Sequence, residues 1–180
     1  MKVGASLIII TSIICFALAG YNLLIVASHP IKYRDEIVHY SNEFSLDPAI
    51  VASLINVESS YREQVISNKS AIGLMQIKLS TTEYLIDYYK LNETISSDEL
   101  MNAEKNLYFG CMYLRYLMNK FEDKYTALAS YNAGETRVRV WLSDKQYSLD
   151  GITLSSIPYK ETRDYIVKIK KNLKFYQKIY

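Results

Sequence analysis

The chain of 180 residues has little cysteine, histidine, proline or glycine, and its charges nearly cancel. Two Cys and two His are too few and too scattered for a structural zinc site. The formal net charge is +2, whereas a chain that depends on phosphate contacts normally carries a concentrated basic excess. Nucleic acid is therefore not an expected partner. Cys15 lies in an apolar run and Cys111 in the folded part, so we expect no disulfide between them.

Apolar residues make up 49% of the sequence and charged residues 22%, a composition that excludes intrinsic disorder. The length leaves room for one domain with a sizeable core, plus a short appendage. The compositional excess is tyrosine, with 17 residues. Tyrosine rings pack in cores, and they also serve as sugar platforms because the ring covers CH groups while the hydroxyl forms hydrogen bonds.

Residues 1–28 form an apolar appendage, since Val3 to Ser28 contains no acidic or basic side chain. A membrane-spanning helix needs about 20 such residues, while the apolar core of a signal peptide has about 7 to 15. The length favours a retained transmembrane helix ahead of a folded domain at 29–180. The alternative is a cleaved signal, because Ala17-Leu18-Ala19 is a small-x-small tripeptide, and the protein would then be secreted. The flanking charges are nearly balanced and leave the orientation open.

Helical periodicity dominates the remaining sequence, and the expected fold is mainly α with no clear strand. Asp47-Pro48 supplies an N-cap and a proline at the first helical position. Capping boxes are expected at Ser80–Glu83 and at Ser96–Glu99. Gly110, in the middle of a long helix, indicates close approach of another element. The expected helices cover residues 30–44, 48–58, 80–90, 103–121, 125–131, 135–141 and 161–180.

Glu58 is the first candidate for chemistry. It continues the helical stripe of Ile50, Val51, Leu54 and Ile55, so its carboxyl falls on the apolar face at the end of that helix. Burial and the negative end of the helix dipole both disfavour the charged form and raise the pKa. A general acid that works near neutral pH needs such a pKa. The alternative is that the stripe ends at Ile55 and Glu58 points into water.

A second candidate region is Ala71–Ile77, where glycine and glutamine stand among apolar residues. Glycine suits backbone packed close to a ligand, and the Gln76 amide offers a donor and an acceptor. The alternative is an ordinary glycine turn that leads to a buried Leu74-Met75 pair.

Two further regions carry polar groups at the ends of expected helices. Tyr131 and Asn132 meet at a helix break before Gly134. Glu161 enters the final helix after the loop that ends at Pro158. The alternative role for Glu161 is to complement the helix dipole in the first turn.

Taken together and in their order along the chain, the four regions described above resemble the catalytic domain of bacterial soluble-type lytic transglycosylases, which has a goose-type-lysozyme-like fold. The resemblance covers roughly Lys32 to Tyr180. The blocks that carry it are Glu58-Ser59, Gly73-Leu74-Met75-Gln76, Tyr131-Asn132-Ala133-Gly134, and Ile157-Pro158 with Glu161-Thr162-Arg163.

The resemblance implies cleavage of the β-1,4 bond between N-acetylmuramic acid and N-acetylglucosamine in peptidoglycan glycan strands, with a 1,6-anhydro product. Glu58 matches the single catalytic acid/base, and no metal or cofactor is implied. Asn132 has the alternative role of shaping the turn at Tyr131. The expected substrate-binding residues are Ser67, Met75, Gln76, Tyr131, Asn132 and Glu161.

The sequence departs from the family at Lys78-Leu79, where relatives usually have Met-Pro. That methionine lines the groove in relatives, so Lys78 leaves this contact and the substrate preference open. A wall substrate also implies an orientation: a single-pass protein of the cytoplasmic membrane with its catalytic domain on the extracytoplasmic side. No protein partner is indicated.

Two other functions compete with transglycosylation. A hydrolytic muramidase on the same fold needs a second carboxylate to place a water, with Glu63, Asp87 and Glu161 as candidates. An inactive wall-binding scaffold domain is the other alternative. The intact Glu58 argues against a scaffold, whereas a groove blocked by Lys78 and its neighbours would favour it.

Overall fold

The computed structural model describes residues 13–20 and 29–180. The chain divides into two units, one up to Ile31 and the other from Lys32 to Tyr180. In the first unit residues 13–20 are helical, while the rest of the predicted anchor, residues 1–12 and 21–28, lies outside the described residues. Among the described residues, no helix combines the length and apolar character needed to cross a membrane.

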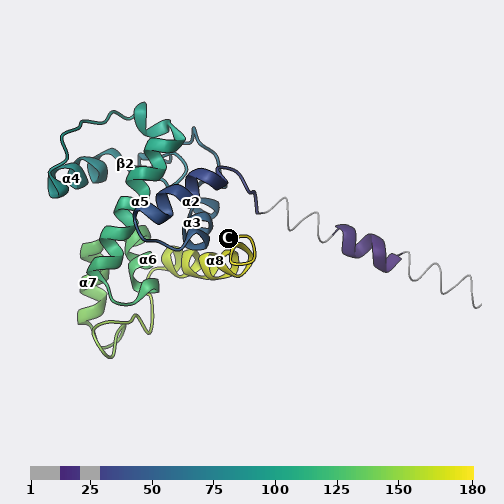
Figure 1. The fold of residues 1–180 in the computed structure, drawn as a ribbon. Coiled ribbons are helices and arrows are strands. Elements are labelled where there is room, and N and C mark those ends of the chain that lie inside the picture. The colour runs from purple at the N-terminus through teal and green to yellow at the C-terminus, as the bar shows by residue number, and fades with distance from the viewer. Residues whose placement is uncertain (1–12, 21–28) are drawn as a thin grey trace, which may run out of the picture. The chain divides into compact units, whose positions relative to one another are not determined.

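The second unit is mainly α, as predicted, and is built from seven α-helices of the described chain and one 3-10 turn (Figure 1). The sequence did not predict the small antiparallel hairpin of β1 and β2, in which Ala71 pairs with Lys78 and Ile72 with Ile77. The elements are α2 (Arg34–Glu43), α3 (Pro48–Ser59), β1 (Ala71–Ile72), β2 (Ile77–Lys78), α4 (Leu79–Tyr89), η1 (Glu99–Met101), α5 (Ala103–Lys120), α6 (Lys124–Ala133), α7 (Glu135–Ser143) and α8 (Lys160–Tyr176).

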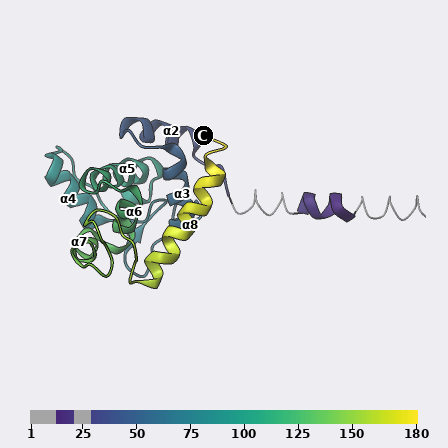
Figure 2. The ribbon, with the colours of Figure 1, turned by 90° about the horizontal axis from the view of Figure 1, so that it is seen from below.

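Helix α5 is the centre of the unit, and it packs against α2, α4 and α6. Helices α3 and α8 lie side by side and also pack closely, as Figure 2 shows. Every residue from Ala49 to Ile55 in α3 is buried, because this short helix is enclosed by α2 and α8. The stripe predicted for the last helix is buried as well: Tyr165, Ile166, Ile169, Leu173 and Tyr176.

The sequence predicts three helix starts from capping residues, at Asp47, Ser80 and Ser96, and two of them are confirmed. Asp47 Oδ1 accepts a hydrogen bond from Ala49 N at 2.8 Å, with Pro48 at the first helical position. Ser96 and Glu99 form a reciprocal capping box at the start of η1, with backbone-to-side-chain distances of 2.8 and 3.2 Å. The capping box at Ser80 is wrong, because α4 begins at Leu79, directly after the hairpin, and has no side-chain cap.

The prediction of a close approach at Gly110 is confirmed. A Cβ atom built on this residue of α5 would lie 2.8 Å from Cβ of Met75, closer than real side chains pack. Because Gly110 has no side chain, α5 can pass directly beside the turn that joins β1 to β2. This turn carries Gln76 and is therefore fixed against the central helix of the unit.

Candidate active site

Glu58 lies in the last turn of α3, which ends at Ser59 before the left-handed backbone of Ser60. Its carboxyl lines a groove of about 430 Å³. The pKa of Glu58 is raised to about 7, chiefly by burial. The negative charge of Glu161 contributes in the same direction, while Tyr165 and the positive charge of Lys69 act in the opposite one. The apolar-face position predicted from the stripe is thus confirmed, and the protonated and ionised forms of Glu58 are both populated near neutral pH.

Two tyrosines, the buried Tyr165 and the partly buried Tyr131, lie beside the Glu58 carboxyl. The Tyr165 hydroxyl, from α8, has no partner of standard hydrogen-bond geometry, yet its interaction with Glu58 lowers the pKa of that carboxyl. Burial first, and then the charge of Glu58, hold the pKa of Tyr165 and Tyr131 well above its usual range. Both phenols therefore remain neutral. The Tyr165 hydroxyl can donate to a carboxylate or a substrate oxygen, whereas the Tyr131 hydroxyl already donates to the Met75 carbonyl.

The groove brings together five of the six predicted substrate-binding residues: Ser67, Gln76, Tyr131, Asn132 and Glu161. The structure does not bring Met75 into the groove. Its side chain is fully buried between the hairpin turn and α5, and its sulfur lies 4.0 Å from Cys111 Sγ. Met75 therefore packs the core, as in the alternative of a buried Leu-Met pair.

The segment that leads into the groove is braced by its own polar groups. Ser67 Oγ accepts a hydrogen bond from Ala71 N at 3.1 Å. The Gln76 amide donates to the carbonyl oxygens of Val65 and Gly73 at 3.2 and 2.9 Å. The side-chain amino group of Gln76 is thus used in hydrogen bonds within this segment, and its side-chain carbonyl oxygen is the group that remains for a ligand.

Asn106, on α5, holds the same turn from below and was not identified from the sequence. It is fully buried, and its amide donates to the carbonyl oxygens of Ile72 and Leu100 at 2.9 and 2.8 Å. Its own carbonyl accepts from Met75 N at 2.8 Å. The turn is tight enough that a Cβ on Gly73 would lie 2.7 Å from Asn106 Cγ. A buried amide with three partners fixes the turn in one geometry.

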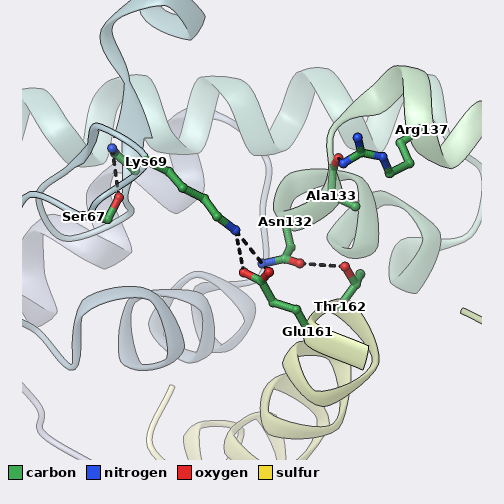
Figure 3. A network of polar contacts seen from close by, with 8 residues as sticks. Ser67, Lys69, Asn132, Ala133, Arg137, Glu161 and Thr162 are labelled. Atoms are coloured by element: carbon green, nitrogen blue, oxygen red, sulfur yellow. Dashed lines mark hydrogen bonds and ion pairs between the residues drawn. The ribbon is translucent and has the colours of Figure 1, made fainter. Parts of the chain in front are cut away.

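Tyr131 crosses from α6 to the hairpin turn. Its hydroxyl donates to the Met75 carbonyl at 2.8 Å, and its ring lies 5.1 Å from that of Tyr113, which also lines the groove. Asn132 accepts a hydrogen bond from Thr162 Oγ1 at 2.8 Å and so links α6 to the start of α8 (Figure 3). This bond supports the alternative in which Asn132 shapes the turn.

Lys69 and Glu161 form an ion pair that the sequence did not reveal. Lys69 Nζ lies 2.8 and 3.1 Å from the two carboxylate oxygens of Glu161, and both side chains line the groove (Figure 3). The positive charge of Lys69 lowers the pKa of Glu58, opposite to the effect of Glu161. No local pattern marks Lys69, because it lies in an irregular segment without periodicity.

The candidate second carboxylates fall in different places. Glu63 accepts hydrogen bonds from the Tyr33 hydroxyl and from Ala103 N at 3.0 and 3.1 Å, away from the groove. Asp87 lines a separate depression on α4. Among the described residues that line the groove, Glu161 is therefore the carboxylate that accompanies Glu58. No cluster of His, Cys, Asp or Glu in the described residues could hold a metal ion.

The chain belongs to the family of the transglycosylase SLT domain, whose model matches residues 36–152. It is 30% identical over 142 residues to the soluble lytic murein transglycosylase of Salmonella typhimurium, covering 78% of this chain and 22% of that protein. It is 27% identical over 170 residues to membrane-bound lytic murein transglycosylase C of Edwardsiella ictaluri, covering 82% of this chain and 47% of that protein. The chain thus spans at most about half the length of these relatives.

Solved structures show the same fold. The lytic transglycosylase Slt of Pseudomonas aeruginosa, solved as an inactive glutamate-to-glutamine mutant, matches with a TM-score of 0.73 at 25% identity over 84% of this chain and 25% of that one. The 70 kDa soluble lytic transglycosylase, solved in complex with bulgecin A, matches with a TM-score of 0.74 at 26% identity over the same shares. The lysozyme-like lytic transglycosylase fold predicted from the sequence is confirmed.

Proposed function

We propose that this chain is a peptidoglycan lytic transglycosylase that cleaves the N-acetylmuramic acid-β-1,4-N-acetylglucosamine bond and leaves a 1,6-anhydro end. The observation that carries the proposal is Glu58, a buried carboxyl with a pKa of about 7 on the wall of an open groove. Family membership and the named relatives support the same reaction.

Glu58 acts twice in this reaction. As a protonated acid it gives its proton to the glycosidic oxygen while the bond to C1 breaks. As a carboxylate it then takes the proton from the C6 hydroxyl of the muramic acid, whose oxygen bonds to C1. The proton returns to Glu58, no water is consumed, and the ring closes as a 1,6-anhydro sugar. A single group with a pKa near 7 suits both roles, because neither protonation state is costly at neutral pH.

Hydrolysis is less well supported by the geometry. An inverting or retaining hydrolase needs a second carboxylate that is available to a water or to C1. Glu161 is the groove carboxylate that could serve, but both of its oxygens contact Lys69 Nζ. In the transglycosylase reaction the substrate's own acetamido group would stabilise the cationic centre in place of that carboxylate.

The structure also gives little support to an inactive scaffold. Lys78 lines the groove, as the departure from the family suggested, but it is exposed, and the groove that it shares with Glu58 keeps a volume of about 430 Å³. A binding module gains nothing from a buried carboxyl, because burial of such a group costs stability whenever it ionises.

The test is mass spectrometry of muropeptides that the full chain releases from purified peptidoglycan, with Glu58→Gln as the control. We expect fragments that end in non-reducible anhydro-muramic acid, one water lighter than hydrolysis products, and none from the control. Reducible ends would identify a hydrolase. No release by a folded protein that binds the wall would identify a scaffold.

We also propose that residues 1–28 hold the protein at the cytoplasmic membrane with the catalytic unit on the extracytoplasmic side. The uncharged run from Val3 to Ser28 and the membrane-bound name of one group of relatives support this placement. We expect the full-length protein to sediment with membranes and its catalytic unit to be digested by protease added outside. A shortened protein in the medium would show instead that the segment is a cleaved signal.

A further inference from the structure

The groove continues into an aromatic surface along three elements. Thr81 on α4, Tyr113 on α5 and Gly134 before α7 all line the groove. Tyr84 lies one helical turn beyond Thr81 on the same face of α4, and Tyr116 lies one turn beyond Tyr113 on the same face of α5. Glu135 follows Gly134 directly and begins α7. The Tyr113 and Tyr116 rings are stacked, with centroids 6.3 Å apart and an interplanar angle of 14°.

The surface beyond the groove consists of Tyr84 and Tyr88 with Tyr116 beneath them, and we call these three residues the tyrosine platform. The Tyr84 ring lies 5.8 Å from both the Tyr88 and the Tyr116 rings, and the Tyr88 ring lies 5.2 Å from that of Tyr116. Tyr84 and Tyr88 are each 46% exposed, although large rings usually pack away from water. This aromatic surface has no covering element in the described structure.

The platform is held rigidly from below. The Tyr116 hydroxyl donates to Glu135 at 2.9 Å and lies 3.0 Å from the Tyr84 hydroxyl. Lys120 Nζ lies 5.3 and 5.1 Å from the Tyr88 and Tyr116 ring centroids, a cation–π geometry. Rings that are already ordered lose little further freedom when a ligand stacks on them, so their exposed faces are suited to binding.

We propose that the tyrosine platform binds N-acetylhexosamine units of the same glycan strand beyond those held in the groove. This inference rests on the proposed function. A glycan strand is the occupant because the platform is continuous with the groove on α4 and α5, so a strand that leaves the groove past Thr81 meets Tyr84 next. Tyrosine rings suit sugars because a ring buries the CH face while the hydroxyl bonds to a sugar hydroxyl.

The experiment measures binding of peptide-free glycan strands to the full chain carrying Glu58→Gln, which blocks turnover. The probes are a short strand, a tetrasaccharide, and strands at least twice that length. Platform variants in this background are Tyr84→Ala with Tyr88→Ala, and Tyr88→Ala alone. The single variant guards against misfolding, because the Tyr88 hydroxyl takes part in none of the described hydrogen bonds. The matched control is Tyr125→Ala on α6, whose ring contacts Lys124 and Lys170 away from the groove.

We expect the parent to prefer long strands, and the double variant to bind them about tenfold more weakly, with tetrasaccharide binding unchanged. Tyr88→Ala alone should show the same effect in smaller measure, and Tyr125→Ala should show none. If the platform variants keep the preference for long strands, or weaken both probes equally, the proposal is wrong while the proposed function stands. If the parent binds neither probe, the proposed function fails and the platform proposal fails with it.

Discussion

Lys69 Nζ and the Glu161 carboxylate lie 2.8 Å apart at the groove that contains Glu58, although 92 positions separate them in the sequence. Both side chains are more than 60% exposed, so the pair itself adds about 0–1 kcal/mol to stability. Its importance is electrostatic. Glu161 raises the pKa of Glu58 and Lys69 lowers it, so the two partners act in opposite directions on the acid/base.

Removing either partner should therefore move the pH dependence of activity. Glu58 must start protonated, so kcat/KM should fall as the pH rises through about 7. Lys69→Met removes a charge that lowers the pKa of Glu58 and should move this fall to higher pH. Glu161→Gln removes a charge that raises the pKa and should move it to lower pH. The measurement is the pH profile of anhydro-muropeptide release.

The control for these profiles is Lys174→Met, which removes an exposed lysine of α8 that does not line the groove. Its profile should match that of the unmodified chain. Shifts of the same sign in Lys69→Met and Glu161→Gln would contradict the electrostatic account and would indicate that the pair acts through structure instead.

Glu58→Gln should stabilise the folded chain at alkaline pH. Folding raises the pKa of Glu58 from an ordinary 4.5 to about 7. Below pH 4.5 the Glu58 carboxyl is protonated in both the folded and the unfolded chain and does not affect the free energy of unfolding. Between pH 4.5 and 7 the carboxyl ionises in the unfolded chain alone, so the stability of the fold decreases as the pH rises. The full cost, present above 7, is about 3 kcal/mol. Urea unfolding of both proteins across this range should show the gain appear with rising pH, and a gain independent of pH would refute the assignment.

Asn106→Ala should destabilise the unit by about 2–4 kcal/mol, because it leaves the Ile72 and Leu100 carbonyls and Met75 N without their buried partner. It should also reduce activity, since the turn that carries Gln76 loses its support. Asn119→Ala, an exposed asparagine on the same helix, should change stability by less than about 0.5 kcal/mol. Equal losses in the two variants, measured by urea unfolding, would show that the network contributes little.

Gly110→Ala should cost about 1–3 kcal/mol, because the new methyl group would overlap the Met75 side chain. The cost should largely disappear in a Met75→Ala background, which makes room for that methyl group. A double-mutant cycle of unfolding free energies measures this coupling, and additive effects would argue against direct contact. The result would also test the placement of Met75 in the core instead of the groove.

Much of the fold follows from local sequence patterns. The N-cap at Asp47 and the apolar stripe of α3 place Glu58 on a buried face at a helix end, because both signals depend on residues within one or two turns. The start of α4 was misplaced for the same reason. Ser80 begins a good local capping pattern, but pairing of Ile72 with Ile77 in the hairpin sets the chain direction and starts the helix earlier.

The sequence by itself thus determined a mainly helical unit, the acid/base candidate and five residues of its groove, because these follow from periodicity and from motifs in a recognised order. Only the tertiary structure decided that Met75 packs the core beside Gly110, that Asn106 holds the turn at Gln76, and that Lys69 pairs with Glu161. Each of these contacts joins residues 30 or more positions apart. Such contacts depend on how whole helices pack, and no local pattern of residue types encodes them.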